Sequence, residues 1–266
     1  MSHQLTADIL NDGLLTERIG RQITVLPDID STNSYALDHL ATQHGPSSDG
    51  HVVFAEHQSA GRGRLGRNWL APRGAGLTLT ALLWEQPGAL PTARLIMAAA
   101  IAVARAVECA TDIVPAIHWP NDVYVRNKKL AGILVEARAC ANQPMPIAVG
   151  IGLNCLQHRN HFPPELRDTA TSLEIESRQP IDRATVARAL LTELDRCFSK
   201  LHPLTDEAIA DEWRQQSSDI GARVTLTSDG QTFTGLIIDI NPHAGLLLQL
   251  DNGTRREFDL ATITRA

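Results

Sequence analysis

The sequence has no surplus of basic residues: 24 Lys and Arg stand against 30 Asp and Glu, and the formal net charge is −6. Proteins that bind nucleic acid without sequence preference usually carry a broad positive field. We therefore expect no nucleic-acid partner, and any binding of an anion must depend on a local group of cations.

Long apolar segments are scarce as well. The longest uncharged apolar run, residues 95–104, is mostly alanine and is about half as long as a membrane-spanning helix. The amino terminus carries Asp8, Asp12 and Glu17 among its apolar residues, whereas a signal peptide begins with basic residues. Since 43% of the residues are hydrophobic, the chain can bury a core, and we expect a soluble cytoplasmic protein with no membrane partner.

The cysteines form no metal-binding or disulfide pattern. They include no CxxC pair, and no histidine lies near them at the spacing of a zinc site. We therefore expect reduced, partly buried thiols and no metal site built from protein side chains. The sequence also lacks internal repeats and low-complexity tracts. The cysteines are Cys109, Cys140, Cys155 and Cys197.

Strand-like and helix-like segments alternate from about residue 23 to residue 217. A short predicted strand, 123–125, is separated from the next, 130–137, only by RNKK, which favours a hairpin. We therefore predict an α+β domain with a mixed or antiparallel sheet, rather than a doubly wound parallel sheet. The other predicted strands are 51–56, 76–84 and 145–153, and the main predicted helices are 92–108 and 184–201.

The pattern changes at Ile220. Short stretches of alternating apolar residues follow, separated by the turn-forming segments SDG, NPHAG and DNG. Several strands in so short a segment predict a small barrel. We place the domain boundary between residues 218 and 219, which gives a large unit of 1–218 and a small unit of 219–266.

Local cations are concentrated in residues 61–69, GRGRLGRNW. The glycines let backbone amides approach a ligand closely, and the arginines carry forked donors that match carboxylate or phosphate oxygens. The segment is not a Walker A motif, because no GK[ST] follows, and a predicted strand stands where a dinucleotide fingerprint would need a helix. Taken alone, the segment also fits a surface loop or an Arg-Gly contact to RNA.

Polar side chains begin the helix that we predict after Asp30. Ser31, Thr32 and Asn33 stand at its first positions, where one hydroxyl or amide would serve as an ordinary N-cap. Three such residues in a row could instead hydrogen-bond a compact polar group that has both donors and an acceptor, such as a ureido ring.

Two further segments place polar groups and glycines near predicted strand ends. Residues 119–122, WPND, form a tight turn, and the hairpin after it brings Lys129 and Gly132 back toward the same end. In residues 149–155, VGIGLNC, the glycines would let a ligand lie against the backbone and the asparagine offers an amide.

In this order, these segments resemble the biotin–protein ligases. The resemblance covers nearly the whole chain and implies a catalytic domain related to class II tRNA synthetases, followed by an SH3-like barrel. The family pattern runs from DSTN through Q-x-x-GRGRxGRxW, KWPND with KLAGILVE, and GIGxN to ATSL. The corresponding residues are 30–33, 58–69, 118–122 with 129–136, 150–154 and 170–173.

The resemblance also implies the reaction. ATP, with Mg²⁺ on its phosphates, activates the carboxylate of biotin to biotinyl-5′-AMP and releases pyrophosphate. A lysine of a biotin carboxyl carrier protein or domain, usually that of acetyl-CoA carboxylase, then attacks the adenylate. Because a carboxylate is a poor electrophile and two anions must meet, this chemistry needs local cations, which residues 61–69 would supply.

Roles for individual residues follow from the same resemblance. Biotin would be bound by Ser31, Thr32, Asn33, Gln58, Arg62, Gly63, Arg64, Lys129 and Gly132. The adenylate would be bound by Arg67, Trp69, His118, Gly152 and Asn154. The catalytic residues would be Lys129, Arg62, Arg64 and Asp122, the last to orient the acceptor lysine or accept its proton. Since water hydrolyses a mixed anhydride, we expect residues 61–69 to close over the ligand as a lid.

The sequence departs from the family pattern at two places. His118 replaces the lysine before WPND, which removes a fixed cation and introduces a side chain that titrates near neutral pH. Either Lys129 carries the electrostatic load, or the position works differently here. Some members also carry an amino-terminal helix-turn-helix domain and act as repressors, whereas this chain reaches Asp30 too early to contain one. We therefore expect a monofunctional ligase.

Two other functions fit parts of the sequence. A lipoate–protein ligase or octanoyltransferase shares the catalytic fold and the acylation of lysine, and His118 alone suggests a non-catalytic biotin-binding regulatory protein. Biotin-dependent exchange of pyrophosphate into ATP would separate these functions from a biotin ligase. Both a monomer and a homodimer are compatible with the sequence.

Overall fold

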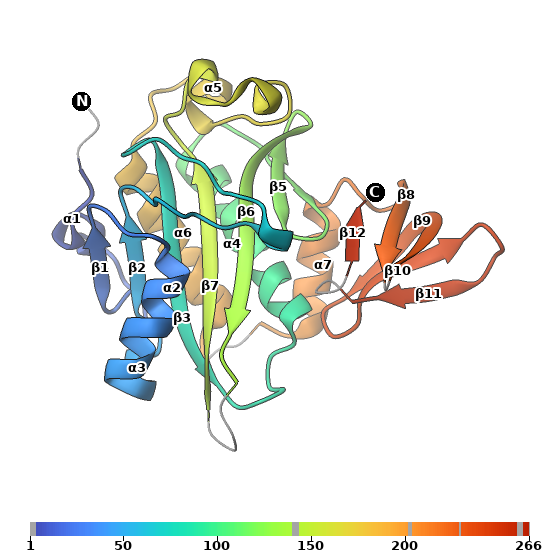
Figure 1. Cartoon of the computed structure of the whole chain (residues 1–266), viewed down its shortest axis with the longest axis horizontal. Coiled ribbons are helices and arrows are strands. Elements are labelled where there is room, and N and C mark those ends of the chain that lie inside the picture. Colours follow the sequence, from blue (N-terminus) through green and yellow to red (C-terminus); the bar gives the residue numbers. More distant parts are fainter. Residues whose placement is uncertain (1–3, 140–143, 202–203, 229, 260–262, 266) are drawn as a thin grey trace.

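The structure, a computed structural model of the chain, describes residues 4–139, 144–201, 204–228, 230–259 and 263–265. A seven-stranded sheet lies at its centre (Figure 1), in the order β1-β2-β3-β7-β6-β5-β4. β1 and β2 are parallel and the other neighbouring pairs are antiparallel, so the predicted mixed sheet is confirmed. The strands are β1 (Ile23–Leu26), β2 (Val52–Ala55), β3 (Gly76–Glu85), β4 (Ala116–His118), β5 (Asp122–Val125), β6 (Lys128–Ala137) and β7 (Met145–Asn154).

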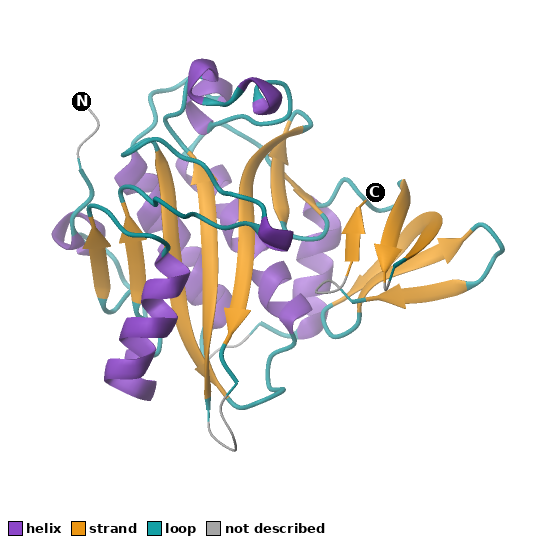
Figure 2. Cartoon of the chain, viewed as in Figure 1, coloured by secondary structure: helices purple, strands orange, loops and turns teal. Residues whose placement is uncertain are grey.

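Helices cover both faces of this sheet (Figure 2). α4 and α6 lie behind the strands in Figure 1, α7 lies beside them next to the C-terminal sheet, and α2, a π-helical turn and α3 form one continuous helix on the opposite face. α1 and α5 are short and lie at the margins. The helices are α1 (Ala7–Asn11), α2 (Thr32–Tyr35), the π-helical turn (Ala36–Leu40), α3 (Ala41–His44), α4 (Thr92–Ala110), α5 (Leu173–Glu176), α6 (Arg183–Phe198) and α7 (Asp206–Gln216).

The main core lies between the sheet and helices α4 and α6. β3 and β7 are central strands that pair along their whole length and are buried over most of it, which explains their near-continuous apolar sequences. α4 is rich in alanine, and these small side chains let it pack closely against α6. Although α4 contains the longest apolar run, no helix in the described part of the chain is long and apolar enough to cross a membrane.

Residues after α7 form a second, five-stranded antiparallel sheet in the order β11-β10-β9-β8-β12, drawn in orange and red in Figure 1. Leu226, Leu246 and Phe258 are buried in it. Gly245 and Gly253 have φ values of 96° and 83°, a conformation that favours glycine in the predicted turns. The strands are β8 (Arg223–Ser228), β9 (Gln231–Asn241), β10 (Gly245–Leu250), β11 (Arg255–Phe258) and β12 (Ile263–Arg265).

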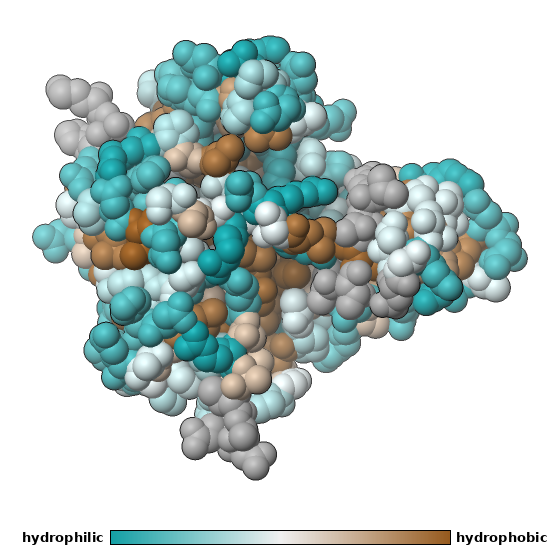
Figure 3. All heavy atoms as spheres, in the orientation of Figure 1, coloured by the Kyte–Doolittle hydropathy of each residue, from teal (hydrophilic) through white to brown (hydrophobic). Residues whose placement is uncertain are grey.

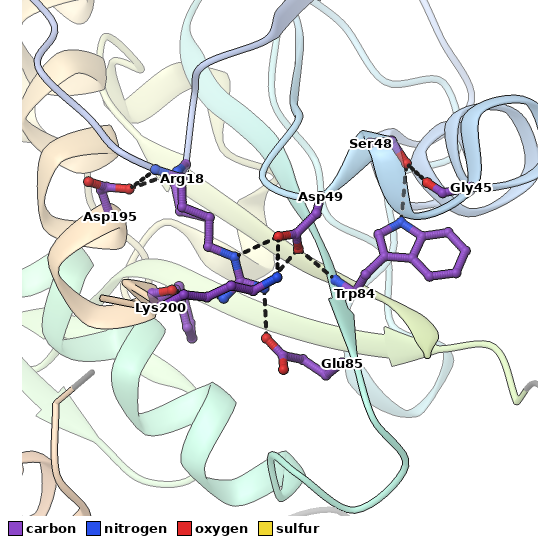
Figure 4. Close-up of polar contacts among 10 residues, drawn as sticks. Arg18, Gly45, Ser48, Asp49, Trp84, Glu85, Asp195 and Lys200 are labelled. Carbon is purple, nitrogen blue, oxygen red and sulfur yellow. Dashed lines mark hydrogen bonds and ion pairs between the residues drawn. The ribbon is translucent and has the colours of Figure 1, made fainter. Parts of the chain in front are cut away.

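The segment before β1 is fixed by a charged cluster that no sequence motif indicates (Figure 4). Arg18 donates hydrogen bonds to Asp49 at 2.7 and 3.1 Å and to Glu85 at 2.6 Å, and Lys200 Nζ lies 2.6 Å from Asp49. Burial alone would raise the pKa of Asp49, but the hydrogen bonds from Arg18 and Lys200 hold it below its usual value. Asp195 of α6 accepts the main-chain N–H of Arg18 at 2.8 Å. The cluster thus joins the N-terminal segment to β3 and α6.

A second buried ion pair ties α6 to the end of β2. Arg183 Nη2 lies 2.6 Å from Glu56 Oε1, and the two side chains are 4% and 5% exposed. Replacing Arg183 with Met leaves the Glu56 carboxylate buried without its cation, so we expect the free energy of unfolding in urea to fall by about 3 to 5 kcal/mol. Arg159→Met is the control, because Arg159 pairs with Asp168 at the surface. Equal unfolding midpoints for the two variants would contradict the prediction.

The described cysteines are free thiols. Cys155 and Cys197 are buried, and burial raises the pKa of each thiol to about 12, so both stay protonated and unreactive at neutral pH. Cys109 is exposed, contrary to the expectation of a partly buried thiol. Cys140 lies outside the described residues.

Candidate active site

A cavity of about 420 Å³ opens on the face of the large sheet that carries α2. Figure 3 shows this face, where apolar atoms gather near the middle and hydrophilic atoms surround them. All the site residues predicted from the sequence line this one cavity, although they come from distant segments. They are Ser31, Thr32, Asn33, Gln58, Arg62, Gly63, Arg64, Arg67, Trp69, His118, Asp122, Lys129, Gly132, Gly152 and Asn154.

One end of the cavity holds a network of neutral polar side chains. Gln58 Oε1 accepts the main-chain N–H of Thr32 at 2.8 Å, and Thr80 Oγ1 lies 2.8 Å from Thr32 Oγ1 and 2.6 Å from Asn33 Oδ1. Ser31 occupies the N-cap position of α2, but its side chain makes no capping hydrogen bond to the described helix. This end is therefore preorganised for a small neutral ligand with several hydrogen-bonding groups.

The glycines of β7 make room for protein side chains. A Cβ atom at Gly150 would lie 2.3 Å from Asn33 Oδ1, and one at Gly152 would lie 2.3 Å from Trp69 Cε2. We expected these glycines to admit a ligand, whereas in the structure they admit Asn33 and the Trp69 indole. The indole Nε1 of Trp69 is buried and has no hydrogen-bond partner among the described residues, so it can donate to a ligand.

Residues 61–69 form a short hairpin beside the cavity. Trp69 N–H donates to Gly61 O at 2.9 Å, and the tip reverses through left-handed conformations at Leu65 (φ 58°) and Gly66 (φ 72°). A Cβ atom at Gly61 would lie 2.5 Å from Trp69 O. Gly61 and Gly66 therefore serve the hairpin itself, by close approach and by turn conformation. Closure of the hairpin as a lid stays a prediction.

Arg62 connects this hairpin to the polar end of the cavity. Its Nη2 donates to Glu136 Oε2 at 2.8 Å and its Nη1 donates to Ser34 Oγ at 2.8 Å. The same Glu136 oxygen accepts Asn33 Nδ2 at 2.7 Å. Glu136 therefore fixes the orientation of the Asn33 amide, because it can only accept hydrogen bonds when ionised.

Arg64 lies where the hairpin, the 119–122 turn and the C-terminal sheet meet. Its Nη1 donates to Asn121 Oδ1 at 3.3 Å, and its Nη2 donates to Ile263 O at 3.1 Å. Burial lowers the pKa of Arg64 below the ordinary value for arginine, against the attraction of Asp122 and Asp259. The guanidinium nevertheless stays charged at neutral pH, so the cavity keeps a fixed cation at this corner.

Lys129 and Asp122 form an ion pair in the wall of the cavity. Lys129 Nζ lies 2.7 Å from Asp122 Oδ1, and the side chains are 33% and 19% exposed. The predicted β5–β6 hairpin is confirmed: Asp122 stands opposite Gly132 and Lys129 opposite Tyr124, so the two charged side chains meet diagonally across the hairpin. Without a ligand each charge neutralises the other, and an anionic ligand can compete with the carboxylate for the ammonium group.

Both the nitrogen and the oxygen of the Asn154 amide are hydrogen-bonded to other protein groups. Its Nδ2 donates to Thr171 O at 2.9 Å, and its Oδ1 accepts Gln157 Nε2 at 2.9 Å. Thr171 N–H in turn donates to Lys129 O at 2.9 Å. Asn154 therefore supports the segment beside Lys129, and its predicted contact with the adenylate stays a prediction.

His118 is also held at both ring nitrogens. Nε2 lies 2.8 Å from Ser218 Oγ, and Nδ1 lies 3.2 Å from Asp219 Oδ1. The ring centroid lies 4.3 Å from that of Tyr124. The ring lines the cavity, but its polar atoms bind the segment that leads into the C-terminal sheet.

Three supporting residues were not predicted from the sequence: Thr80, Glu136 and Asp219. Thr80 is fully buried within an apolar strand, and such a polar residue is the one local signal that could have identified it. Glu136 ends a recognised motif, but nothing in the motif indicates its partners. Asp219 lies at a domain boundary, where a charged residue is ordinarily expected at the surface.

Comparison with known proteins identifies the relatives. The Biotin/lipoate A/B protein ligase family matches residues 25–154, and the Biotin protein ligase C terminal domain matches residues 219–263. A biotin–[acetyl-CoA-carboxylase] ligase of Mycobacterium tuberculosis is 35% identical over 253 residues, which cover 92% of this chain and 90% of that protein. The bifunctional ligase/repressor BirA of Bacillus subtilis is 32% identical over 261 residues, covering 96% and 78%. The biotin protein ligase from Aquifex aeolicus, solved in complex with biotin and ATP, has a TM-score of 0.73 and 26% identity, covering 92% of this chain and 100% of that chain.

The two sheets and a cavity lined by arginine, lysine and aspartate thus define a protein ligase of the biotin and lipoate class. Within that class, the chain belongs to the biotin protein ligase family. The predicted function, an ATP-dependent biotin–protein ligase, is confirmed. A lipoate-transferring enzyme and a non-catalytic biotin-binding protein are not favoured.

Proposed function

We propose that this cavity binds biotin and ATP together, forms biotinyl-5′-AMP, and then presents it to a lysine of a biotin carboxyl carrier protein or domain. The observation that carries the proposal is the convergence of every predicted site residue on one cavity, with a polar end and a charged wall. The name of the Mycobacterium tuberculosis relative points to acetyl-CoA carboxylase as the enzyme that carries the acceptor.

The neutral polar end suits the ureido ring of biotin. Such a ring has two N–H donors and one carbonyl acceptor, which match the hydroxyl and amide groups of Ser31, Thr32, Asn33 and Gln58. Thr80 and Glu136 would hold these side chains in one orientation before the ligand arrives. The apolar side chains of the sheet beside this end would cover the aliphatic chain of biotin.

The charged wall suits the adenylation step. A carboxylate oxygen of biotin attacks the α-phosphorus of ATP, the bond to the leaving pyrophosphate breaks, and biotinyl-5′-AMP forms. Lys129 would hold the carboxylate and then the acyl-phosphate oxygens, while Arg62 and Arg64 neutralise the phosphate charge. Arg67 and Trp69 would hold the nucleotide.

Asp122 would act in the transfer step. Once Lys129 binds the acyl phosphate, the Asp122 carboxylate is released to meet the ammonium group of the acceptor lysine. It accepts one proton, the neutral amine attacks the acyl carbon, and AMP leaves with the second amine proton as the amide forms. The 2.7 Å separation of the two side chains in the absence of ligand supports this exchange of partners.

Mg²⁺ enters this proposal as the ion on the phosphates of ATP. Among the described residues there is no group of three or more His, Cys, Asp or Glu side chains that could hold a metal ion. We assign residues 1–218 to a class II tRNA synthetase-like catalytic domain and 219–266 to an SH3-like domain. The cytoplasmic location, the absence of a nucleic-acid partner and the choice between monomer and homodimer stay predictions.

The proposal is tested by biotin-dependent exchange of labelled pyrophosphate into ATP, followed by transfer to a carrier domain. We expect exchange with biotin and none with lipoate or octanoate, and covalent biotin on one acceptor lysine. Exchange that depends on lipoate, or biotin binding with no exchange, would overturn the proposal.

Replacing Arg64 with Ala removes a forked donor from the phosphate of the intermediate. We expect release of biotinyl-5′-AMP to become about 10- to 100-fold faster, since a hydrogen bond to a charged group contributes about 1.5 to 3 kcal/mol. Dissociation of radiolabelled adenylate during a chase with unlabelled biotin and ATP measures this rate. Arg73→Ala serves as the control, because Arg73 pairs with Asp28 at the surface. Unchanged retention in the Arg64 variant would count against its assignment to the adenylate.

A further inference from the structure

We propose that Asp219 is a positioning residue through which the C-terminal sheet holds the catalytic turn at residues 119–122. Asp219 lies between α7 and β8, and its side chain is 2% exposed. Its Oδ2 accepts the main-chain N–H of Trp119 at 2.6 Å, and its Oδ1 lies 3.2 Å from His118 Nδ1. A buried carboxylate bound on both oxygens fixes the start of the turn in one position.

The two residues before Asp219 contact β4, the strand that leads into the turn. Ser217 forms a parallel bridge with Ile117, and Ser218 Oγ lies 2.8 Å from His118 Nε2. Asp219 N–H donates to Ser217 Oγ at 3.1 Å. Three consecutive residues on the path into the C-terminal sheet therefore contact three consecutive residues at the end of β4.

The residues that Asp219 contacts are neighbours of the groups that we propose to take part in the reaction. His118 stands opposite Asp122 in the β4–β5 register, and Asp122 contacts Lys129 at 2.7 Å. Asn121, inside the turn, accepts the hydrogen bond from Arg64. A shift of the turn would thus displace the proposed proton acceptor and the arginine contact together, and misplacement by about 1 Å can cost about 100-fold in rate.

This arrangement gives His118 a different role from the lysine of the family pattern. Nδ1 faces Asp219 and Nε2 faces Ser218, so both ring nitrogens are taken up by protein groups. Neither nitrogen is left for a phosphate oxygen. His118 therefore ties the catalytic turn to the segment at residues 217–219 instead of binding the adenylate.

Ser218, His118 and Asp219 also match the hydrogen-bond order of a serine hydrolase triad. Two observations favour positioning over a nucleophilic serine. Ser218 is not among the described residues that line the cavity, and the N–H of Asp219 is already donated to Ser217, so it is not free to stabilise an oxyanion.

The test rests on the proposed function and uses the full chain with Asp219→Ala and, as a control, Asp251→Ala, whose carboxylate pairs with Arg223 on the surface of the same sheet. One measurement is amide hydrogen exchange in peptides that span residues 117–125. The other is biotin transfer from preformed biotinyl-5′-AMP to a biotin carboxyl carrier domain. For Asp219→Ala we expect faster exchange in the turn and a kcat lower by about 100-fold, with the KM for biotin in pyrophosphate exchange unchanged. Asp219→Asn, which can still accept from Trp119, should recover most of the rate.

Wild-type rates of amide hydrogen exchange and of biotin transfer in Asp219→Ala would overturn the proposal. An equal loss of the transfer rate in Asp251→Ala would also overturn it. If Asp219→Ala does not fold, Asp219→Leu takes its place, because it fills a similar volume and can accept no hydrogen bond from Trp119 or His118; wild-type values there would also overturn the proposal. Labelling of Ser218 by a fluorophosphonate, together with loss of biotin transfer in Ser218→Ala, would show that Ser218 is a nucleophile and would overturn the positioning role. A wild-type chain without biotin-dependent pyrophosphate exchange would refute the proposed function, while the difference in hydrogen exchange would still decide the role of Asp219.

Discussion

Replacing Lys129 with Met is expected to lower the rate of biotin-dependent pyrophosphate exchange by about 100- to 1,000-fold, the usual effect of removing one hydrogen-bond donor from a developing oxyanion. The variant also leaves the Asp122 carboxylate, which lies 2.7 Å from Lys129 Nζ, without its cation. That negative charge then repels both the carboxylate of biotin and the phosphates of ATP. The measurement is kcat and KM for biotin and for ATP in the exchange assay.

Lys128→Met provides the matched control, since it removes the same charge one residue away. Lys128 begins β6 and is not among the described residues that line the cavity. It should keep wild-type kcat. If both variants lose activity equally, the effect belongs to the net charge of the hairpin and not to Lys129. A Lys129 variant that raises only the KM for biotin would show that the side chain binds the ground state without stabilising the transition state.

The fold was predictable where neighbouring residues decide it. The four residues RNKK cannot carry a parallel crossover, so the β5–β6 hairpin follows from spacing alone. The turn segments after residue 219 likewise predict antiparallel strands. The Arg18 cluster was beyond prediction, because Arg18 meets Asp195 from 177 residues away, and no local pattern records such a contact.

In the candidate site, too, local features could be predicted and contacts between remote residues could not. Its residues could be chosen from motifs, and the structure brings them together in one cavity. Their supporting partners could not be chosen, because the pairs are remote: Thr80 to Asn33 spans 47 residues, Arg62 to Glu136 spans 74, and Trp119 to Asp219 spans 100. The motif glycines were recognised, but the reason for Gly152 depends on where Trp69 lies, which only the folded chain shows.

Gly152→Ala should therefore impair the enzyme without unfolding it. The new Cβ would lie 2.3 Å from Trp69 Cε2 and 2.6 Å from Trp69 Nε1, and a rigid indole cannot give way as a flexible side chain could. Trp69 is also held by Gly61, whose carbonyl accepts its main-chain N–H at 2.9 Å. The whole hairpin must shift, so we expect adenylation to slow by about 100-fold, while β7 itself tolerates alanine because Gly152 does not have a positive φ.

Gly63→Ala gives the comparison for this prediction, because a Cβ atom there would have its nearest neighbour, Arg67 O, at 3.5 Å. It changes a glycine of the same hairpin without a steric conflict, so its loss of pyrophosphate exchange should be much smaller than that of Gly152→Ala. The unfolding midpoints in urea of both variants should match the wild type, which separates a displaced indole from a weakened strand. If Gly152→Ala adenylates biotin at the wild-type rate, the indole can move at little cost, and the packing of Trp69 on β7 does not position the nucleotide.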